Sequence, residues 1–168
     1  EHRMKKVYLA GPDVFFHDAL LRAEKNKTLC LSHGFEPLHP ADGIETTATG
    51  IYQANIQMIQ QADAVLANLN PFRGAEPDSG TAFEVGYAAA LKIPIIGYLD
   101  GPTDIKDQVR KYYGPIYFDE SKQMWLDQNE SMVEDFGLPV NLMLGVSAKI
   151  VFGDLLTAIV HLQAHLYD

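Results

Sequence analysis

The sequence predicts an α/β fold: a doubly wound, flavodoxin/Rossmann-like sheet of five parallel strands with helices on both faces. Short apolar runs alternate with segments whose apolar residues follow helical spacing, and turn residues separate them. This alternation is typical of a parallel sheet that is covered on both sides. With 168 residues and 47% hydrophobic content, the chain is long enough for one such domain and too short for two ordinary ones.

The expected elements follow in chain order. We expect strands at residues 5–10, 35–38, 63–69, 93–99 and 149–152, and helices at residues 17–32, 51–62, 81–92 and 154–165. Residues 39–50 are polar and rich in turn formers. The pattern weakens over residues 104–137, where we expect a helix at 105–112, a strand at 115–118 and a helix at 121–133. We expect one domain over residues 4–168, and expect residues 1–3 to be a remnant of expression rather than a targeting signal.

Composition and charge argue against several classes of partner. The net charge is −9 and the 13 Lys and Arg residues are scattered, so the chain lacks the basic stripe that binding to a nucleic acid polymer requires. A small neutral ligand is therefore expected. Cys30 is the sole cysteine, which leaves no disulfide framework and no cysteine-based metal site, and no apolar run approaches the ~18 residues of a membrane span. These features predict a cytoplasmic protein without a membrane partner.

The most informative stretch is residues 78–88, which carries two carboxylates around a turn of small residues. Gly80 lies at a junction between a predicted strand and a predicted helix, and in open α/β sheets such junctions lie where ligands bind. Gly80 permits close approach of a ligand, and the helix dipole would keep Glu84 ionised in the first turn, as a nucleophile requires. Two structural readings compete: Thr81-x-x-Glu84 is also a capping box, and Asp78 is also a common turn residue before glycine.

Four ordered segments of the chain are similar to segments of one known family. They are Tyr8-Leu9-Ala10-Gly11-Pro12, Asn55-Ile56-x-x-Ile59-x-x-Ala62-Asp63-Ala64-Val65, residues 78–88, and Pro139-Val140-Asn141-Leu142-Met143. Through these segments most of the chain resembles the nucleoside 2-deoxyribosyltransferases. The resemblance implies an enzyme that transfers a 2-deoxyribosyl group from one nucleobase to another through a covalent sugar–enzyme ester.

The chemistry of base exchange explains why such residues would be needed together. Breaking an N-glycosidic bond develops oxocarbenium character on the sugar and negative charge on the departing base. By the resemblance, Glu84 would be the nucleophile below the anomeric carbon, Asp78 would serve the base, and the Tyr8 hydroxyl would hold Glu84 by a hydrogen bond. Attack by Glu84, followed by attack of a second base on the face that the first base left, would give two inversions and net retention, and neither a metal nor an organic cofactor is expected.

The resemblance also implies substrate-binding residues and a partner subunit. Phe15 would stack on the base, Asp42 would contact the base, and Asn55 stands where some relatives carry an aspartate, which leaves it hydrogen bonding without charge. Asn141 and Met143 lie in a segment that, in the family, enters the active site of the neighbouring subunit. The expected partners are 2'-deoxynucleosides, free nucleobases and a second copy of the chain, in a homodimer with shared sites that assembles into a hexamer. Three structural readings compete with these roles: Phe15 as part of an apolar plug, Asn141 and Met143 as part of an ordinary turn, and Tyr8 as an ordinary strand aromatic.

Two alternatives to deoxyribosyl transfer stay open at the level of sequence. One is hydrolysis of the N-glycosidic bond of deoxynucleotides or nucleotides, which would need cationic or glycine-rich phosphate contacts. Only Arg73 stands near the nucleophile segment. The other is a non-catalytic nucleoside-binding module in which Glu84 is a helix cap.

Overall fold

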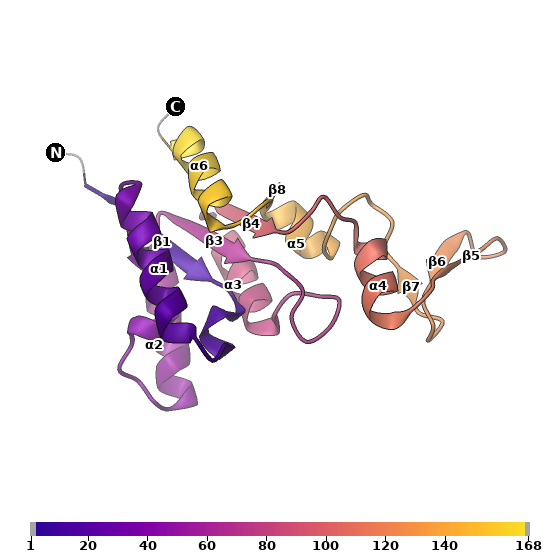
Figure 1. Ribbon diagram of the computed structural model, residues 1–168, viewed down its shortest axis with the longest axis horizontal. Coiled ribbons are helices and arrows are strands. Elements are labelled where there is room, and N and C mark those ends of the chain that lie inside the picture. Colours follow the sequence, from indigo (N-terminus) through magenta and orange to yellow (C-terminus); the bar gives the residue numbers. More distant parts are fainter. Residues whose placement is uncertain (1–2, 167–168) are drawn as a thin grey trace.

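The computed structural model describes residues 3–166, and it contains the expected parallel sheet with helices on both faces (Figure 1). The strand order is β2-β1-β3-β4-β8, and every neighbouring pair is parallel. Residues 1–2 of the expected expression remnant and residues 167–168 of the expected domain lie outside the described residues. The five strands are β1 Lys5–Ala10, β2 Phe35–Leu38, β3 Ala64–Asn68, β4 Ile95–Leu99 and β8 Lys149–Phe152.

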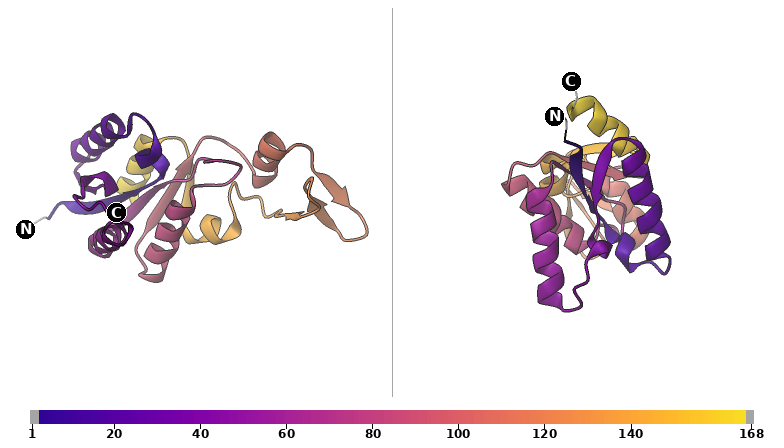
Figure 2. Two further views of the ribbon diagram at one scale, coloured as in Figure 1. Left: turned by 90° about the horizontal axis from the view of Figure 1, so that it is seen from below. Right: turned by 90° about the vertical axis from the view of Figure 1, so that its left-hand side faces the viewer.

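The helices divide between the two faces of this sheet (Figure 2). One face is covered by α1 (Ala19–Ser32) and α6 (Leu155–Leu166), whose buried residues share a core with the sheet. The other face is covered by α2 (Ala48–Gln61), α3 (Ser79–Ala90) and the short α5 (Leu142–Ser147), which closes against α3. The prediction of a doubly wound architecture is confirmed.

Alternation along β1 decides which side chains face which helices. Val7 and Leu9 are buried in the core under α1 and α6, whereas Tyr8 and Ala10 are buried in the core under α2 and α3. Because successive side chains of a strand point to opposite faces, these assignments follow from the strand itself. Tyr8 is therefore directed toward the helix that carries Glu84.

The strand order creates a switch point between β1 and β3. From β1 the chain moves outward to β2 on one side, then returns through α2 to β3 on the other side of β1. The loops after β1 and β3 consequently diverge at their carboxyl ends, which is where ligands bind in open α/β sheets. The loop after β1 contains the 3₁₀ turn η1 (Pro12–Phe15), and the loop after β2 contains η2 (Pro40–Asp42).

Residues 104–139 form an arm that extends away from the sheet, as the left view of Figure 2 shows. The arm consists of helix α4 (Ile105–Tyr113) and a small antiparallel sheet of β5 (Tyr117–Asp119), β6 (Met124–Leu126) and β7 (Met132–Val133). The prediction of a helix over residues 121–133 is wrong. Gln123 and Glu130 have φ angles of 55° and 60°. The Asp127 carboxylate accepts hydrogen bonds from Asn129 N and Ser131 N, so turns replace the helix.

Two helices begin earlier than the apolar pattern indicated, and in both cases a capping side chain is the reason. Thr47 accepts a hydrogen bond from Gly50 N at 3.0 Å, so α2 starts at Ala48. Asp78 accepts one from Thr81 N at 2.9 Å, so α3 starts at Ser79. Helix α5 was not predicted from the sequence, because its six residues are too few for a periodic pattern.

Candidate active site

A cleft of about 700 Å³ opens beside the β1/β3 switch point, on the face covered by α2 and α3. Its lining combines the segment after β1, the loop between β2 and α2, α2 itself and the first turns of α3. Most of the lining is apolar, with a few polar side chains, and its volume is in the range of small-molecule sites. Five of the predicted site residues line this cleft, namely Phe15, Asn55, Asp78, Gly80 and Glu84.

Glu84 is held at the cleft by Tyr8. The fully buried Tyr8 hydroxyl donates a hydrogen bond to Glu84 Oε2, which joins the first strand to the third helix. Burial, reinforced by the neighbouring Glu84, raises the pKa of Tyr8 above its ordinary value, so the phenol keeps the proton that it donates. The predicted contact between these two residues is present in the structure.

The pKa of the Glu84 carboxyl is raised from 4.5 to about 7. Burial is the main cause, because it disfavours the charged form; the Tyr8 hydrogen bond lowers this pKa and the charge of Asp78 raises it. Glu84 lies in the second turn of α3, since the helix starts at Ser79. The expectation of a Glu84 in the first turn that the helix dipole keeps ionised is therefore wrong: Glu84 lies beyond the first turn, and burial raises its pKa. The capping-box reading of Thr81 and Glu84 is also wrong, because Asp78 caps the helix.

Asp78 both caps helix α3 and lines the cleft. Its Oδ2 atom accepts hydrogen bonds from Thr81 N at 2.9 Å and from Thr81 Oγ1 at 2.8 Å. These two bonds leave the other carboxylate oxygen of Asp78 as the atom that can meet a ligand. Because the cap fixes the side chain, Asp78 and Glu84 lie on the same helix end and interact electrostatically.

The described lining of the cleft is negatively charged. It contains the carboxylates of Glu45, Asp78 and Glu84, and no lysine, arginine or histidine. Arg73 lies outside it, with its guanidinium 4.4 Å from the Phe72 ring centroid and 5.2 Å from that of Phe15. An anionic phosphate would therefore find like charge within the cleft and no cation.

Asn55 brings a buried hydrogen-bond acceptor to the cleft, and Phe15 brings an exposed aromatic ring. The Asn55 Oδ1 atom is buried and has no hydrogen-bond partner among the described residues. Such an orphan acceptor is costly in a folded protein and is characteristic of sites that bind a ligand. Phe15 is 56% exposed and stacks on Phe72 with a centroid distance of 5.5 Å, so an aromatic face remains at the cleft rim.

Asp42 is oriented differently from the other predicted site residues. Its carboxylate accepts a 2.8 Å salt bridge from Lys27 of α1, and it does not line the cleft, although Ala41 and Gly43 do. Glu45, three residues further along the same loop, lines the cleft instead. The polar character of residues 39–50 indicated the right loop, but spacing alone could not tell which carboxylate faces inward.

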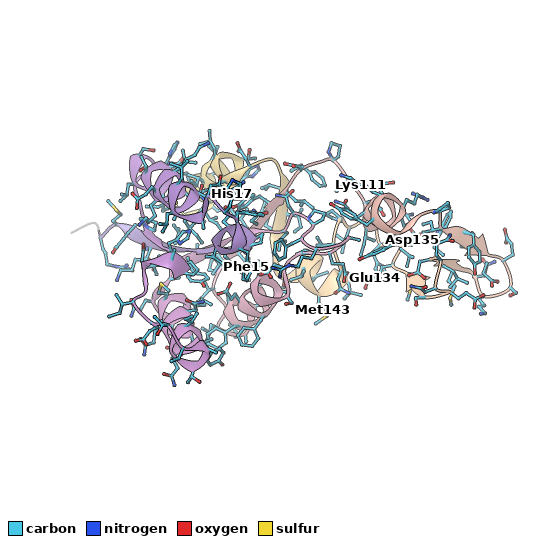
Figure 3. All side chains as sticks on the ribbon, turned by 60° about the horizontal axis from the view of Figure 1, so that its bottom comes forward. Phe15, His17, Lys111, Glu134, Asp135 and Met143 are labelled. Atoms are coloured by element: carbon cyan, nitrogen blue, oxygen red, sulfur yellow. The ribbon has the colours of Figure 1, made fainter. Side chains whose placement is uncertain are left out.

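Asn141 and Met143 do not line the cleft of their own chain. Asn141 caps α5, accepting from Met143 N at 2.8 Å and donating to Glu134 Oε2 at 3.2 Å. Met143 is 72% exposed and projects from α5 into open space in Figure 3. Neither residue therefore contacts a ligand in the cleft within a single chain.

The sequence analysis missed two aromatic residues of the cleft, Tyr52 of α2 and Phe83 of α3. Their rings lie 6.0 Å apart between centroids, and both line the cleft while remaining more than half exposed. The signal was present, because each aromatic occupies a helix position adjacent to a polar site residue. Only the packing of α2 beside α3 brings the two rings together.

Within residues 3–166 there is no group of three or more His, Cys, Asp or Glu side chains arranged to hold a metal ion. None of the helices in that same range combines the length and the apolar character needed to cross a membrane.

Comparison with known proteins identifies relatives of this architecture. Residues 7–143 match the family model described as nucleoside 2-deoxyribosyltransferase. A solved 2-deoxyribosyltransferase from Leishmania mexicana is 36% identical, with a TM-score of 0.78 over 96% of this chain and 99% of that one. An uncharacterized protein of Schizosaccharomyces pombe is 30% identical over 144 residues, which are 80% of this chain and 68% of that protein.

A more distant structure shares the fold alone. A CMP N-glycosidase from Clostridium botulinum is 16% identical, with a TM-score of 0.52 over 96% of this chain and 100% of that one. At this level of identity the likeness concerns the arrangement of strands and helices, and it carries no information about substrate.

Proposed function

We infer the reaction from the family: this chain belongs to the nucleoside 2-deoxyribosyltransferases, and it is an enzyme of that kind. We propose that it exchanges the base of 2'-deoxynucleosides through a covalent ester between the sugar and Glu84, with net retention at the anomeric carbon. The observation that carries this proposal is the Tyr8–Glu84 hydrogen bond inside a cleft that Asp78 also lines.

In the first half-reaction a Glu84 carboxylate oxygen attacks C1' of the deoxyribose. The bond between C1' and the base nitrogen breaks, its electron pair stays on the base, and Asp78 donates the proton that neutralises the leaving base. In the second half-reaction a different base attacks C1' from the side that the first base left, the ester bond breaks, and Asp78 takes up the proton of the incoming base. Two inversions at C1' restore the original configuration.

The pKa of Glu84 suits a group that must act as nucleophile and then as leaving group. With a pKa of about 7, a substantial fraction of Glu84 is ionised at neutral pH and can attack. Burial also makes the ionised Glu84 carboxylate less stable than an exposed carboxylate would be. Its attack on C1' is favoured for that reason, because the attack removes the buried charge. The Tyr8 hydrogen bond fixes the rotamer and stabilises the carboxylate when it is released.

The charge of the cleft supports an uncharged donor. A deoxynucleoside brings no negative charge to Glu45, Asp78 and Glu84, whereas a 5'-nucleotide would place its phosphate in a field of the same sign. The same argument supports free nucleobases as acceptors. We further propose a cytoplasmic homodimer, assembled into a hexamer, in which the partner's α5 segment completes each site.

An assay of base exchange tests this function directly. Deoxyinosine and adenine are incubated with the enzyme, and deoxyadenosine formation is followed; deoxyinosine 5'-phosphate replaces the nucleoside in a parallel reaction. The proposal expects deoxyadenosine from the first donor and little product from the second. Release of free sugar without base exchange would indicate a hydrolase, and the absence of both reactions would indicate a module that only binds nucleosides.

A further inference from the structure

His39 is a buried ring that anchors the loop wall of the cleft. It follows β2, is 3% exposed, and its Nδ1 atom accepts a 3.0 Å hydrogen bond from the backbone N–H of Ala41. The residues that it anchors, Pro40 and Ala41, both line the cleft, as does Gly43 directly after the turn. No role in the reaction has been assigned to His39 so far.

The hydrogen bond from Ala41 fixes the protonation state of the ring. An imidazole nitrogen can accept a hydrogen bond only while it carries no proton, so His39 is neutral with its proton on Nε2. A protonated ring would present an N–H to the Ala41 N–H, and the turn would lose its anchor. A backbone hydrogen bond from Asp42 N to His39 O, 3.0 Å long, closes the same turn, but its side-chain anchor exists only with neutral His39.

The groups around the His39 ring determine its pKa, and therefore how strongly the neutral form is favoured. The side chains of Asp13, Asn26 and Tyr98 line a small cavity that His39 also lines, with a volume of about 10 Å³. Burial lowers the pKa of His39 and is the largest influence; Asp42 and Asp13 raise it, and Lys27 lowers it. Because the folded pKa lies below the usual 6.5, the stability of the anchored turn is present above pH 6.5. It is lost as the pH falls through the folded pKa.

We propose that His39 is a positioning residue for deoxyribosyl transfer: neutral His39 holds residues 40–43 as a wall of the cleft, and its protonation releases that wall and weakens nucleoside binding. The inference rests on the proposed function for its ligand, a 2'-deoxynucleoside. The effect belongs to binding and not to the chemical step, because His39 does not line the cleft that contains Glu84.

The matched variant is His39→Asn. The Asn side chain offers an oxygen that accepts the same N–H two residues on, as in an Asx-turn, but it does not titrate. His39→Ala removes the acceptor. We expect His39→Ala to raise KM about tenfold, on the scale of one lost hydrogen bond, with kcat little changed, and His39→Asn to restore KM at pH 7.

Binding is measured without interference from catalysis in the Glu84→Ala background, where the nucleophile neither reacts nor titrates. Calorimetry with deoxyadenosine, carried from pH 7.5 downward until the fold begins to be lost, should show an affinity that falls on acidification with histidine at position 39 and stays nearly constant in His39→Asn. The other groups of the cleft are the same in both proteins, so their contributions cancel in the comparison. Equal pH dependence in the two proteins would overturn the proposal.

A readout without substrate separates this inference from the proposed function. Hydrogen exchange of the Ala41 amide should accelerate on acidification, relative to the intrinsic rate, in wild type and not in His39→Asn. Exchange that behaves alike in both proteins would refute the anchoring role even if base exchange is confirmed. If the Ala41 amide responds as expected but no base is exchanged, the proposed function fails while the anchor stands.

Discussion

At the scale of the residue, Glu84 shows how burial and hydrogen bonding compete over one carboxyl group. Burial raises its pKa, and the bond from Tyr8 opposes that rise without cancelling it, so the group titrates near pH 7. The nucleophilic form is the ionised one, and it gains population as the pH rises. The pH dependence of activity therefore reports the balance between these two effects.

The first prediction concerns that pH dependence. In wild type, kcat/KM should rise with pH through an apparent pKa of about 7. Tyr8→Phe removes an interaction that lowers the pKa of Glu84, so the rising limb should move to higher pH and activity at pH 6.5 should fall. A profile of kcat/KM from pH 5 to pH 9 measures the shift. An unchanged limb in Tyr8→Phe would show that the phenol does not act on the nucleophile.

The second prediction identifies the covalent intermediate. A 2-fluoro-arabinosyl nucleoside slows the breakdown of a sugar ester, because the fluorine destabilises oxocarbenium character at C1'. Mass spectrometry after proteolysis should find one sugar mass on the peptide that contains Glu84. Glu84→Ala should carry no label and should be inactive. A label on another carboxylate, or full activity in Glu84→Ala, would remove Glu84 from this role.

The third prediction concerns proton donation by Asp78. Asparagine is as good a helix cap as aspartate, so Asp78→Asn should keep the start of α3 while losing the acid. Cleavage of ordinary deoxynucleosides should slow by ~10²-fold or more, the usual scale for general acid catalysis. Donors whose leaving group needs no proton should be affected much less. Equal losses for both kinds of donor would contradict a proton-transfer role.

At the scale of the element, α3 is both a packing unit and the carrier of the site. Its buried face, formed by Thr81, Val85 and Ala88, packs on the sheet, and this packing orients Glu84 of the same helix toward the cleft. Strand β4 supports the arrangement from within the sheet, where it pairs with β3 and β8. Substitutions in α3 and β4 should change the free energy of unfolding according to the free space around the substituted residue.

The fourth prediction compares two glycine substitutions. In Gly97→Ala of β4, the added methyl would overlap Leu69 Cδ1 and lie 3.2 Å from Ile150 Cδ1, so the free energy of unfolding should fall by about 1–3 kcal/mol. In Gly86→Ala of α3, the methyl meets nothing within 4 Å, and unfolding should cost roughly 0.5–1 kcal/mol more. Urea unfolding at one fixed protein concentration measures both. Shifts of the same sign would contradict this account of local packing.

At the scale of the whole molecule, the single chain leaves several large apolar side chains exposed on α5 and near the base of the arm. Met143 and Val146 of α5 are 72% and 76% exposed, and Phe136 at the base of the arm is 65% exposed. Together with the projecting arm in Figure 1, this surface fits an assembly in which α5 of one chain lies against another. Asn141, which caps α5, would then reach the neighbouring cleft.

The fifth prediction tests that shared site by mixing inactive variants. Glu84→Ala and Asn141→Ala should each be nearly inactive alone. When the two are refolded together in equal amounts, about half of the dimers are mixed, and one of the two sites in each mixed dimer is intact. Activity should therefore return to about a quarter of wild type.

The control for this experiment is Asn141→Ser, which keeps a capping side chain at the start of α5 and brings no second negative charge to Glu134. If Asn141→Ala fails only because α5 loses its cap, Asn141→Ser should be fully active. Verified subunit exchange without recovery of activity would place the function of Asn141 within its own chain.

Local sequence predicted much of the fold and part of the site. The strands of the parallel sheet and its long helices are strongly patterned, so their order followed from apolar spacing and turn residues. In the arm, the strand expected at residues 115–118 overlaps β5, but β6 and β7 were missed because they have only two or three residues, too few for alternation to be visible. The cleft positions of Asn55, Asp78 and Glu84 agreed with the motif reading, whereas Asp42 pairs with Lys27 and Glu45, which was not predicted, lines the cleft instead.

By itself the sequence determined the succession of elements and the residue types of the site, because periodicity, caps and motif spacing are properties of the chain over short distances. Only the tertiary structure decided the pKa values of those residues and the direction in which their side chains point. It joined Tyr8 to Glu84 across 76 positions, buried Tyr8 fully and Glu84 in part, and so moved the pKa of Glu84 upward where the helix-dipole argument had expected an ionised group. It also directed Glu45 inward and Asp42 toward Lys27. Desolvation and long-range pairing depend on which surfaces meet, and no short stretch of sequence contains that information.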